Sequence, residues 1–256
     1  MAFYGCKGLK SATIGSGATS IGRLAFNLCN GLEEITVSPE NPAYCSEDDV
    51  LFDKDKTTLI KYPDAKTGNY VVPNCVTRIE ELAFFDCVGL TGITVPEGLI
   101  SIGPSVFAHC IGLKEVVIPN SVTSIGDTAF TVCSELTTIT IGSGVTTIGI
   151  MAFVSCSALT TIYNYATTPQ EVDDKTFFNI APVCTLYVPA ESVELYKAAP
   201  IWKNFNVQAI TGTGINHTPS VSKGEEAWYT LDGRKLDGKP TKKGLYINNG
   251  IMVVIK

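Results

Sequence analysis

The sequence predicts an α/β solenoid: stacked coils place a curved parallel sheet on one wall and short helices or tight coils on the other, followed by a small antiparallel β module. Three observations predict this fold. A cysteine recurs with a fixed period, an apolar set recurs with it, and two hydrophobic periodicities alternate inside each copy. The cysteines are Cys6, Cys29, Cys87, Cys110, Cys133 and Cys156, and every interval except that from Cys29 to Cys87 is 23 residues.

One copy of the repeat occupies residues 124–141. Ile139 and Ile141 alternate with threonines, and this period of two predicts a half-buried strand. Residues 126–133 instead space their apolar side chains by three and four, as one or two helical turns do. A single copy cannot enclose its own apolar residues, so the copies must stack. The apolar set is Ile125, Ala129, Phe130, Cys133, Leu136, Ile139 and Ile141.

Proline and small polar residues mark where each predicted strand ends. Pro96 and Pro119 follow strands directly, and each lacks the N–H that would continue the hydrogen-bond ladder. Asn120-Ser121 and residues 142–144 then supply the turn.

An insertion of 35 residues beyond one period separates Cys29 from Cys87, and we place it at about residues 38–69. Its apolar runs at 50–52 and 59–62 flank a polar turn, which predicts a hairpin or two successive ladder strands. Asp53 and Asp55 in that turn suggest calcium. A calcium loop counted from Asp53 needs glycine and glutamate where Thr58 and Asp64 stand, so we expect a solvated turn and no metal site.

After the repeats, residues 185–189 predict a last strand and residues 190–199 a helical cap with Ser192 as its N-cap. Residues 211–224 are rich in glycine, threonine and serine and predict a linker, which places the solenoid at 1–210. Residues 225–256 contain two turn dipeptides between strand patterns, and they predict a β module of two hairpins.

The motif Ile-Gly-x-x-Ala-Phe-x-x-Cys-x-x-Leu-x-x-Ile-x-Ile resembles the BspA-type leucine-rich repeat, which is common in surface proteins of Bacteroidetes and in some mucosal parasites. The resemblance covers about residues 1–210, including the insertion, which is similar to a variant unit of the same family. Val106 departs from the motif's alanine, and residues 176–178 close the series without the expected cysteine. The resemblance implies a leucine-rich-repeat solenoid with an adhesion role.

The C-terminal residues carry a second resemblance. The pattern Tyr-x-Leu-Asp-Gly-Arg, followed by Lys-Gly-Leu-Tyr-Ile, is similar to the short C-terminal sorting modules of secreted Bacteroidetes proteins. This implies export or attachment to the surface. A β appendage that only stabilises the solenoid is an equal alternative.

Composition limits the partners. The formal charge is −6; residues 225–256 hold six basic and four acidic side chains, or +2, which leaves −8 for the rest. An acidic solenoid is a poor ligand for phosphate backbones, so we expect no nucleic acid partner. No run is long enough to span a membrane. The chain contains no secretory signal, and Met1 lies within a repeat; we expect a fragment of a longer secreted or cell-surface protein.

The chain has nine cysteines and two histidines. Ladder cysteines stack at about the 4.8 Å strand spacing, which is longer than the Cβ separation that a disulfide prefers, so we expect buried free thiols. Cys45, Cys75 and Cys184 lie outside the ladder, and their redox state stays open.

His109 occupies a variable, exposed position beside Cys110, and His217 lies in the linker. No nucleophile, phosphate or metal motif appears. We therefore expect neither an enzyme nor a cofactor.

The strand residues that point away from the core form columns across the predicted sheet face, and repeat proteins use such faces for partners. Threonine also favours strands in water, so each residue alone has a structural explanation. We expect a monomer that binds a protein or glycan there; a spacer that presents another module is the alternative, and a glycan-processing enzyme a distant one. The candidate residues are Glu34, Thr36, Thr94, Glu115, Val117, Thr138, Thr140, Thr161 and Tyr163.

Overall fold

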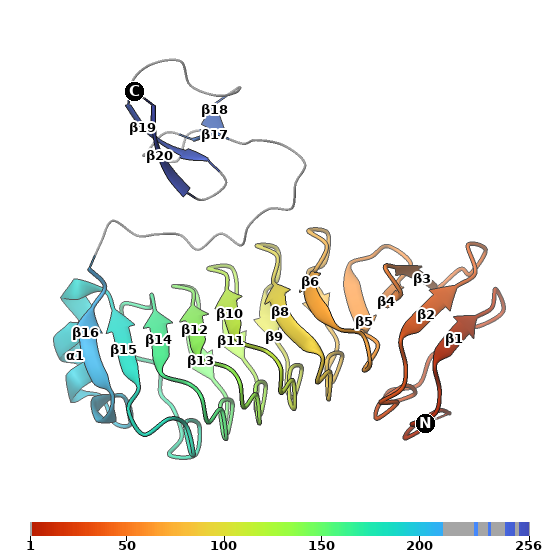
Figure 1. The fold of residues 1–256 in the computed structure, drawn as a ribbon, viewed down its shortest axis with the longest axis horizontal. Coiled ribbons are helices and arrows are strands. Elements are labelled where there is room, and N and C mark those ends of the chain that lie inside the picture. The colour runs from red at the N-terminus through yellow and green to blue at the C-terminus, as the bar shows by residue number, and fades with distance from the viewer. Residues whose placement is uncertain (1, 212–227, 230–234, 237–243, 249–250, 256) are drawn as a thin grey trace. The chain divides into compact units, whose positions relative to one another are not determined.

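The structure is a computed structural model that describes residues 2–211, 228–229, 235–236, 244–248 and 251–255. The chain divides into two compact units, residues 1–210 and 211–256. Figure 1 shows the first unit as a stack of coils with a parallel sheet along one side. The predicted solenoid is therefore confirmed.

Seven parallel strands form the main sheet of the first unit. The sheet has the order β16-β15-β14-β12-β10-β8-β6, so neighbouring coils are also neighbours in sequence. Two earlier strands, β1 (Ser11–Ile14) and β2 (Glu34–Val37), pair in parallel as a separate sheet. The seven are β6 (Gly68–Val71), β8 (Leu90–Thr94), β10 (Glu115–Ile118), β12 (Thr138–Ile141), β14 (Thr161–Asn164), β15 (Thr185–Val188) and β16 (Asn206–Ala209).

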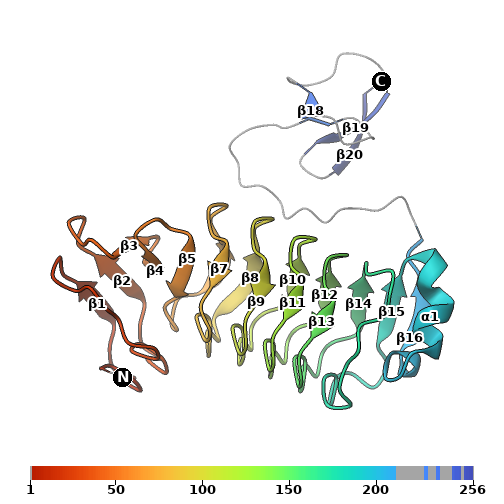
Figure 2. The same ribbon diagram turned by 180° about the vertical axis from the view of Figure 1, so that it is seen from behind.

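A short second ladder follows the turn in three successive coils, as Figure 2 shows from behind. It consists of β9 (Ser101–Ile102), β11 (Ser124–Ile125) and β13 (Thr147–Ile148), which pair in parallel. The isoleucine of each pair points into the core and is buried. This ladder fixes the coil spacing on a second side of the solenoid.

The remaining wall consists of turns and not of helices. In five of the coils two non-glycine residues adopt a left-handed backbone, such as Thr128 (φ 54) and Val132 (φ 60). This conformation is unfavourable for such residues. It allows alternate N–H groups to reach the next coil: Ser105 N donates to Asp127 O at 3.0 Å, and Phe107 N to Ala129 O at 2.8 Å. Tight coils, one of the two predicted forms, are thus the observed ones.

A column of aromatic rings runs through the core behind this wall. Phe84, Phe107, Phe130, Phe153 and Phe177 stack with successive ring centroids 5.0, 5.1, 5.4 and 5.3 Å apart. The column belongs to the larger of two buried clusters, whereas the first two coils form a smaller one around Phe26 and Ile35. Ring stacking therefore repeats along the chain as the cysteine does.

The insertion forms a hairpin, which decides between the two predicted alternatives. β4 (Val50–Asp53) pairs antiparallel with both β3 (Tyr44–Glu47) and β5 (Thr58–Lys61). β5 then pairs in parallel with β7 (Arg78–Ile79), so the solenoid resumes directly. In the β4–β5 turn, Asp53 accepts hydrogen bonds from Thr57 Oγ1 at 2.7 Å and Thr58 N at 2.9 Å.

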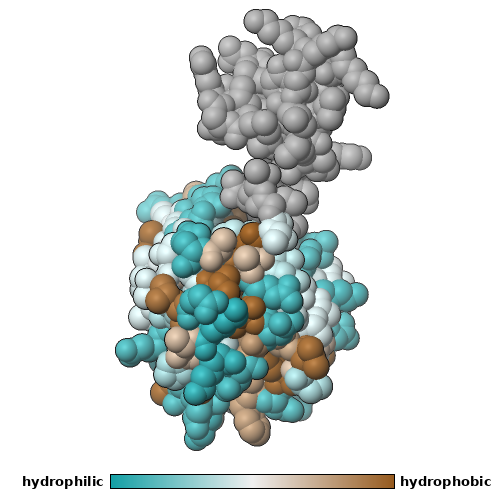
Figure 3. Space-filling model, turned by 90° about the vertical axis from the view of Figure 1, so that its left-hand side faces the viewer, coloured by the Kyte–Doolittle hydropathy of each residue, from teal (hydrophilic) through white to brown (hydrophobic). Residues whose placement is uncertain are grey.

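The last coil is covered by three short helices instead of the one predicted at 190–199: η1 (Ala190–Ser192), α1 (Val193–Ala198) and η2 (Trp202–Asn204). Ser192 occupies the predicted N-cap position of α1, but its hydroxyl donates to Thr167 O at 2.8 Å and makes no capping hydrogen bond. Trp202 is buried and closes the aromatic column against Phe177. Figure 3 shows this end, where hydrophilic residues surround a smaller hydrophobic area.

The second unit contains a four-stranded antiparallel sheet of order β18-β17-β19-β20. Its strands are β17 (Trp228–Tyr229), β18 (Lys235–Leu236), β19 (Gly244–Asn248) and β20 (Ile251–Ile255). The two hairpins pair with each other through β17 and β19. The linker predicted at 211–224 lies, except for its first residue, outside the described residues.

Candidate functional site

The register of the main sheet aligns the predicted binding residues in two columns. Thr140 pairs with Val117 on one side and with Tyr163 on the other. Thr138 likewise pairs with Glu115 and Thr161, so the second column runs parallel to the first. Parallel strands in register hold equivalent side chains about 4.8 Å apart, which makes each column continuous. Glu34 and Thr36 lie instead on the separate two-stranded sheet.

The candidate residues differ in how much surface they expose. Glu34, Thr36 and Glu115 are exposed. Thr94, Val117, Thr138, Thr161 and Tyr163 are half-buried. Thr140 is only 8% exposed, because it lies between Val117 and the larger Tyr163. A partner at this face would therefore meet the neighbours of Thr140 and little of Thr140 itself.

The structure adds a tyrosine that the sequence prediction missed. Tyr187 pairs with Tyr163 in register, and the two rings stack with centroids 4.9 Å apart and planes 16° from parallel. Gln208 lies next in the same column. The signal was present as the matching tripeptides Thr161-Ile162-Tyr163 and Thr185-Leu186-Tyr187, but their spacing is 24 residues instead of 23.

The outward positions of the main sheet are almost free of charge. From β6 to β16 the one charged side chain among them is that of Glu115, in the column that ends at Asn206. Most of the others are hydroxyl or amide side chains, which donate and accept hydrogen bonds without charge. A face of this kind suits a neutral polar partner better than a polyanion.

The ladder cysteines are structural thiols that bond to the preceding coil. Cys110 Sγ donates to Phe84 O at 3.1 Å, Cys133 Sγ to Phe107 O at 3.2 Å and Cys156 Sγ to Phe130 O at 3.1 Å. Burial raises the pKa of the Cys110 thiol to about 12, so the reactive thiolate is scarce near neutral pH. The thiol of Cys110 thus bonds to a backbone carbonyl and does not pair with His109.

The nine cysteines are free, as predicted for the six of the ladder, but they differ in exposure. Cys6 is exposed although it belongs to the ladder. The three cysteines left open by the sequence also differ: Cys75 is exposed, Cys45 is half-buried and Cys184 is buried.

His109 is more constrained than its variable position suggested. It adopts a left-handed backbone with φ 63, its N–H donates to Thr131 O at 2.7 Å, and its ring lies 5.3 Å from that of Phe85. The position requires a particular backbone conformation but no particular side chain, so different residue types can occupy it in other coils. Within the described residues no group of three His, Cys, Asp or Glu side chains could hold a metal ion.

Parallel coils of 23 residues, a phenylalanine column and an outward strand face define a leucine-rich-repeat protein of the short-coil type. The chain belongs to the BspA type leucine rich repeat family. The family profile matches residues 1–63 and 61–184 with six copies.

Solved bacterial structures share the fold. The pneumococcal vaccine antigen PcpA aligns with a TM-score of 0.61 at 23% identity over 80% of this chain and 56% of that one. A leucine-rich repeat protein from Eubacterium ventriosum gives 0.56 at 24% identity over 84% and 63%. A leucine rich cell surface protein from Faecalibacterium prausnitzii gives 0.52 at 31% identity over 61% and 48%.

The chain thus spans less than two thirds of each of these proteins. No curated protein sequence matches it. In the part of the chain that the structure describes, no helix has the length and apolar character needed to cross a membrane.

Proposed function

We propose that this chain is a non-enzymatic binding scaffold of a secreted or cell-surface protein, and that it adheres to host proteins, glycans or other cells through its sheet face. Family membership supports a protein-binding scaffold. The similar Faecalibacterium protein is described as a cell surface protein. Export or surface attachment through residues 225–256 belongs to the same proposal.

The stacked pair Tyr163 and Tyr187 is the observation that carries this function. Tyrosine offers a large apolar area and a hydroxyl at little cost in side-chain entropy, and it is enriched among residues that dominate binding. Both rings are half-buried, so the sheet fixes their positions before a partner arrives. Thr161 and Thr185 flank them in the adjacent column and supply hydroxyl groups.

The ring stacking also indicates how a partner would contact the pair. Each ring covers one face of the other, so the pair presents its ring edges and hydroxyl groups outward. A partner that hydrogen-bonds along the column fits this geometry better than one that needs an open ring face. We therefore place a protein partner ahead of a glycan.

An array of host-matrix proteins and glycans tests the function. We expect saturable binding by the wild-type chain and its loss in the triple variant Glu115→Ala/Tyr163→Ala/Tyr187→Ala. A matched variant on the opposite wall, Glu135→Ala/Phe178→Ala, removes an exposed carboxylate and an exposed aromatic ring and should bind normally.

Two results would contradict the proposal. Absence of saturable binding across the array would favour a spacer that presents another module. Turnover of any arrayed glycan would instead show an enzyme.

A further inference from the structure

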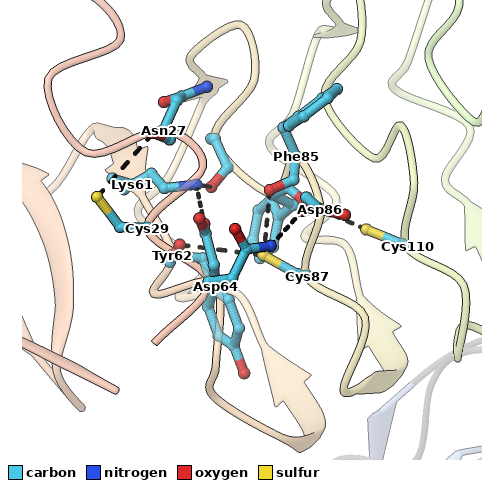
Figure 4. Close-up of polar contacts among 12 residues, drawn as sticks. Asn27, Cys29, Lys61, Tyr62, Asp64, Phe85, Asp86, Cys87 and Cys110 are labelled. Carbon is cyan, nitrogen blue, oxygen red and sulfur yellow. Dashed lines mark hydrogen bonds and ion pairs between the residues drawn. The ribbon is translucent and has the colours of Figure 1, made fainter. Parts of the chain in front are cut away.

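The most unusual polar contact of the solenoid is a buried ion pair in the insertion. Lys61 Nζ lies 2.6 Å from Asp64 Oδ1, and the two side chains are 4% and 0% exposed. Figure 4 shows them pointing toward one another among Cys29, Tyr62 and Cys87. Isolated buried ion pairs are costly, because the attraction of the charges rarely exceeds their loss of hydration.

The backbone on either side of Asp64, from Tyr62 to Ala65, is held by neighbouring coils. Tyr62 replaces the phenylalanine of the aromatic column, and its ring lies 5.0 Å from that of Phe84. Tyr62 N donates to Ala83 O at 3.0 Å, and Ala65 N donates to Leu32 O at 2.8 Å. Neighbouring coils therefore hold the backbone on both sides of Asp64. Lys61 and Asp64 meet between them, where the smaller and larger apolar clusters adjoin.

The surroundings satisfy the carboxylate poorly. Neither oxygen of Asp64 has a hydrogen-bond partner of normal geometry, although Lys61 is at ion-pair distance. Among the residues that the structure describes, the ammonium group makes one other polar contact, a long hydrogen bond to Ala83 O at 3.4 Å. Burial raises the pKa of the Asp64 carboxyl, and the opposing effect of Lys61 is smaller. Transfer of the ammonium proton to the carboxylate would leave both groups neutral and would remove the cost of burying two charges.

We infer that Lys61 and Asp64 condense into an intramolecular isopeptide bond. The ammonium of Lys61 first gives a proton to the carboxylate of Asp64. The free amine then attacks Cγ, the N–C bond forms, and the carboxyl hydroxyl leaves with an amine proton as water. One amide and one water result, so atoms and charges balance and no oxidant or cofactor is needed.

The geometry favours this step. An Nζ–Oδ1 distance of 2.6 Å and a C–O bond of about 1.23 Å place the nitrogen at most about 3.8 Å from Cγ, close to a near-attack separation. Burial keeps bulk water, the reagent of the reverse reaction, away from the pair. The product replaces two buried charges with one neutral amide, so the charge burial is relieved at the junction of the two clusters.

Intact mass measured under denaturing conditions tests the inference on the purified full chain. We expect a mass about 18 Da below the sum of the residues, which corresponds to one water. Trypsin should then yield the continuous peptide 57–66 with the same deficit, because an acylated Lys61 is not cleaved. An unmodified mass, with separate peptides 57–61 and 62–66, would overturn the inference.

Two variants make the assignment specific. Lys61→Arg removes the nucleophile and should show the full mass. Asp64→Asn should lose ammonia instead of water and reach the same final mass as the wild type, because both would contain the same amide. Aspartates before glycine, at 232 and 237, can also lose water as succinimides. A deficit that maps there, or that disappears in mild alkali, would likewise contradict the isopeptide bond.

Discussion

At the scale of single residues, the recurring cysteine acts as a hydrogen-bond donor. The buried thiols of Cys110, Cys133 and Cys156 each bond to the carbonyl oxygen of a phenylalanine in the preceding coil, as Cys133 does to Phe107. A thiol is small enough for the core and still satisfies that buried acceptor. The recurrence of the cysteine therefore reflects the need of a buried backbone carbonyl for a hydrogen-bond donor.

The buried thiols predict that stability decreases in alkali. The pKa of Cys110 rises from its ordinary 9.0 to about 12 in the folded chain. Between these values the unfolded chain loses the proton that the folded chain retains, so the free energy of unfolding falls as pH rises from 9 to 12. Urea unfolding at successive pH values measures this slope.

A pair of variants isolates the contribution of one thiol. Cys110→Ala should lower stability at pH 7 and flatten the alkaline slope. Leu136→Ala removes a buried side chain that cannot ionise, so it should lower stability and keep the slope. Equal slopes in Cys110→Ala and the wild type would show that the buried Cys110 thiol does not cause the loss of stability in alkali.

At the scale of the elements, the sequence predicted the strands well and the opposite wall only in part. β10 follows from alternation and from Pro119, which ends it, and β12 follows from alternation and from the Gly-Ser-Gly turn after it. The wall residues are spaced as in a helix, but left-handed residues such as Leu82 and Met151 turn the chain. Nothing in a leucine or methionine indicates a left-handed backbone, since hydrogen bonds between coils impose it.

The close spacing of the coils predicts which glycines tolerate a side chain. A Cβ at Gly144 would overlap the backbone oxygen of Asn120 in the preceding coil, whereas one at Gly103 would meet only Val106 Cγ2 at 3.6 Å. We expect Gly144→Ala to cost about 1–3 kcal/mol of unfolding free energy. Gly103→Ala should stay within about 0.5 kcal/mol. Thermal or urea unfolding measures the stability of the two variants. An equal loss in both would contradict the close contact between coils at Gly144.

At the scale of the whole molecule, the sequence predicted the binding face of the sheet but not Tyr187, which lies on it. Tyr163 followed from the period. Tyr187 did not, because the last coil is one residue longer and lacks the cysteine that marks the register. The pair Lys61 and Asp64 was equally hidden, since a polar insertion gives no sign that two of its charges enter the core.

The outward columns around Tyr163 and Tyr187 are the proposed binding site for the partner. The most direct measurement is the dissociation constant of a partner found on the array, for the wild type, for Tyr163→Ala/Tyr187→Ala and for Phe178→Ala. Phe178 is a matched control, because it is an aromatic residue on the other wall and is 65% exposed. We predict at least a tenfold weaker affinity, about 1.4 kcal/mol, for the double variant and no change for Phe178→Ala. Unchanged affinity in the double variant, with a loss in Phe178→Ala, would contradict the claim.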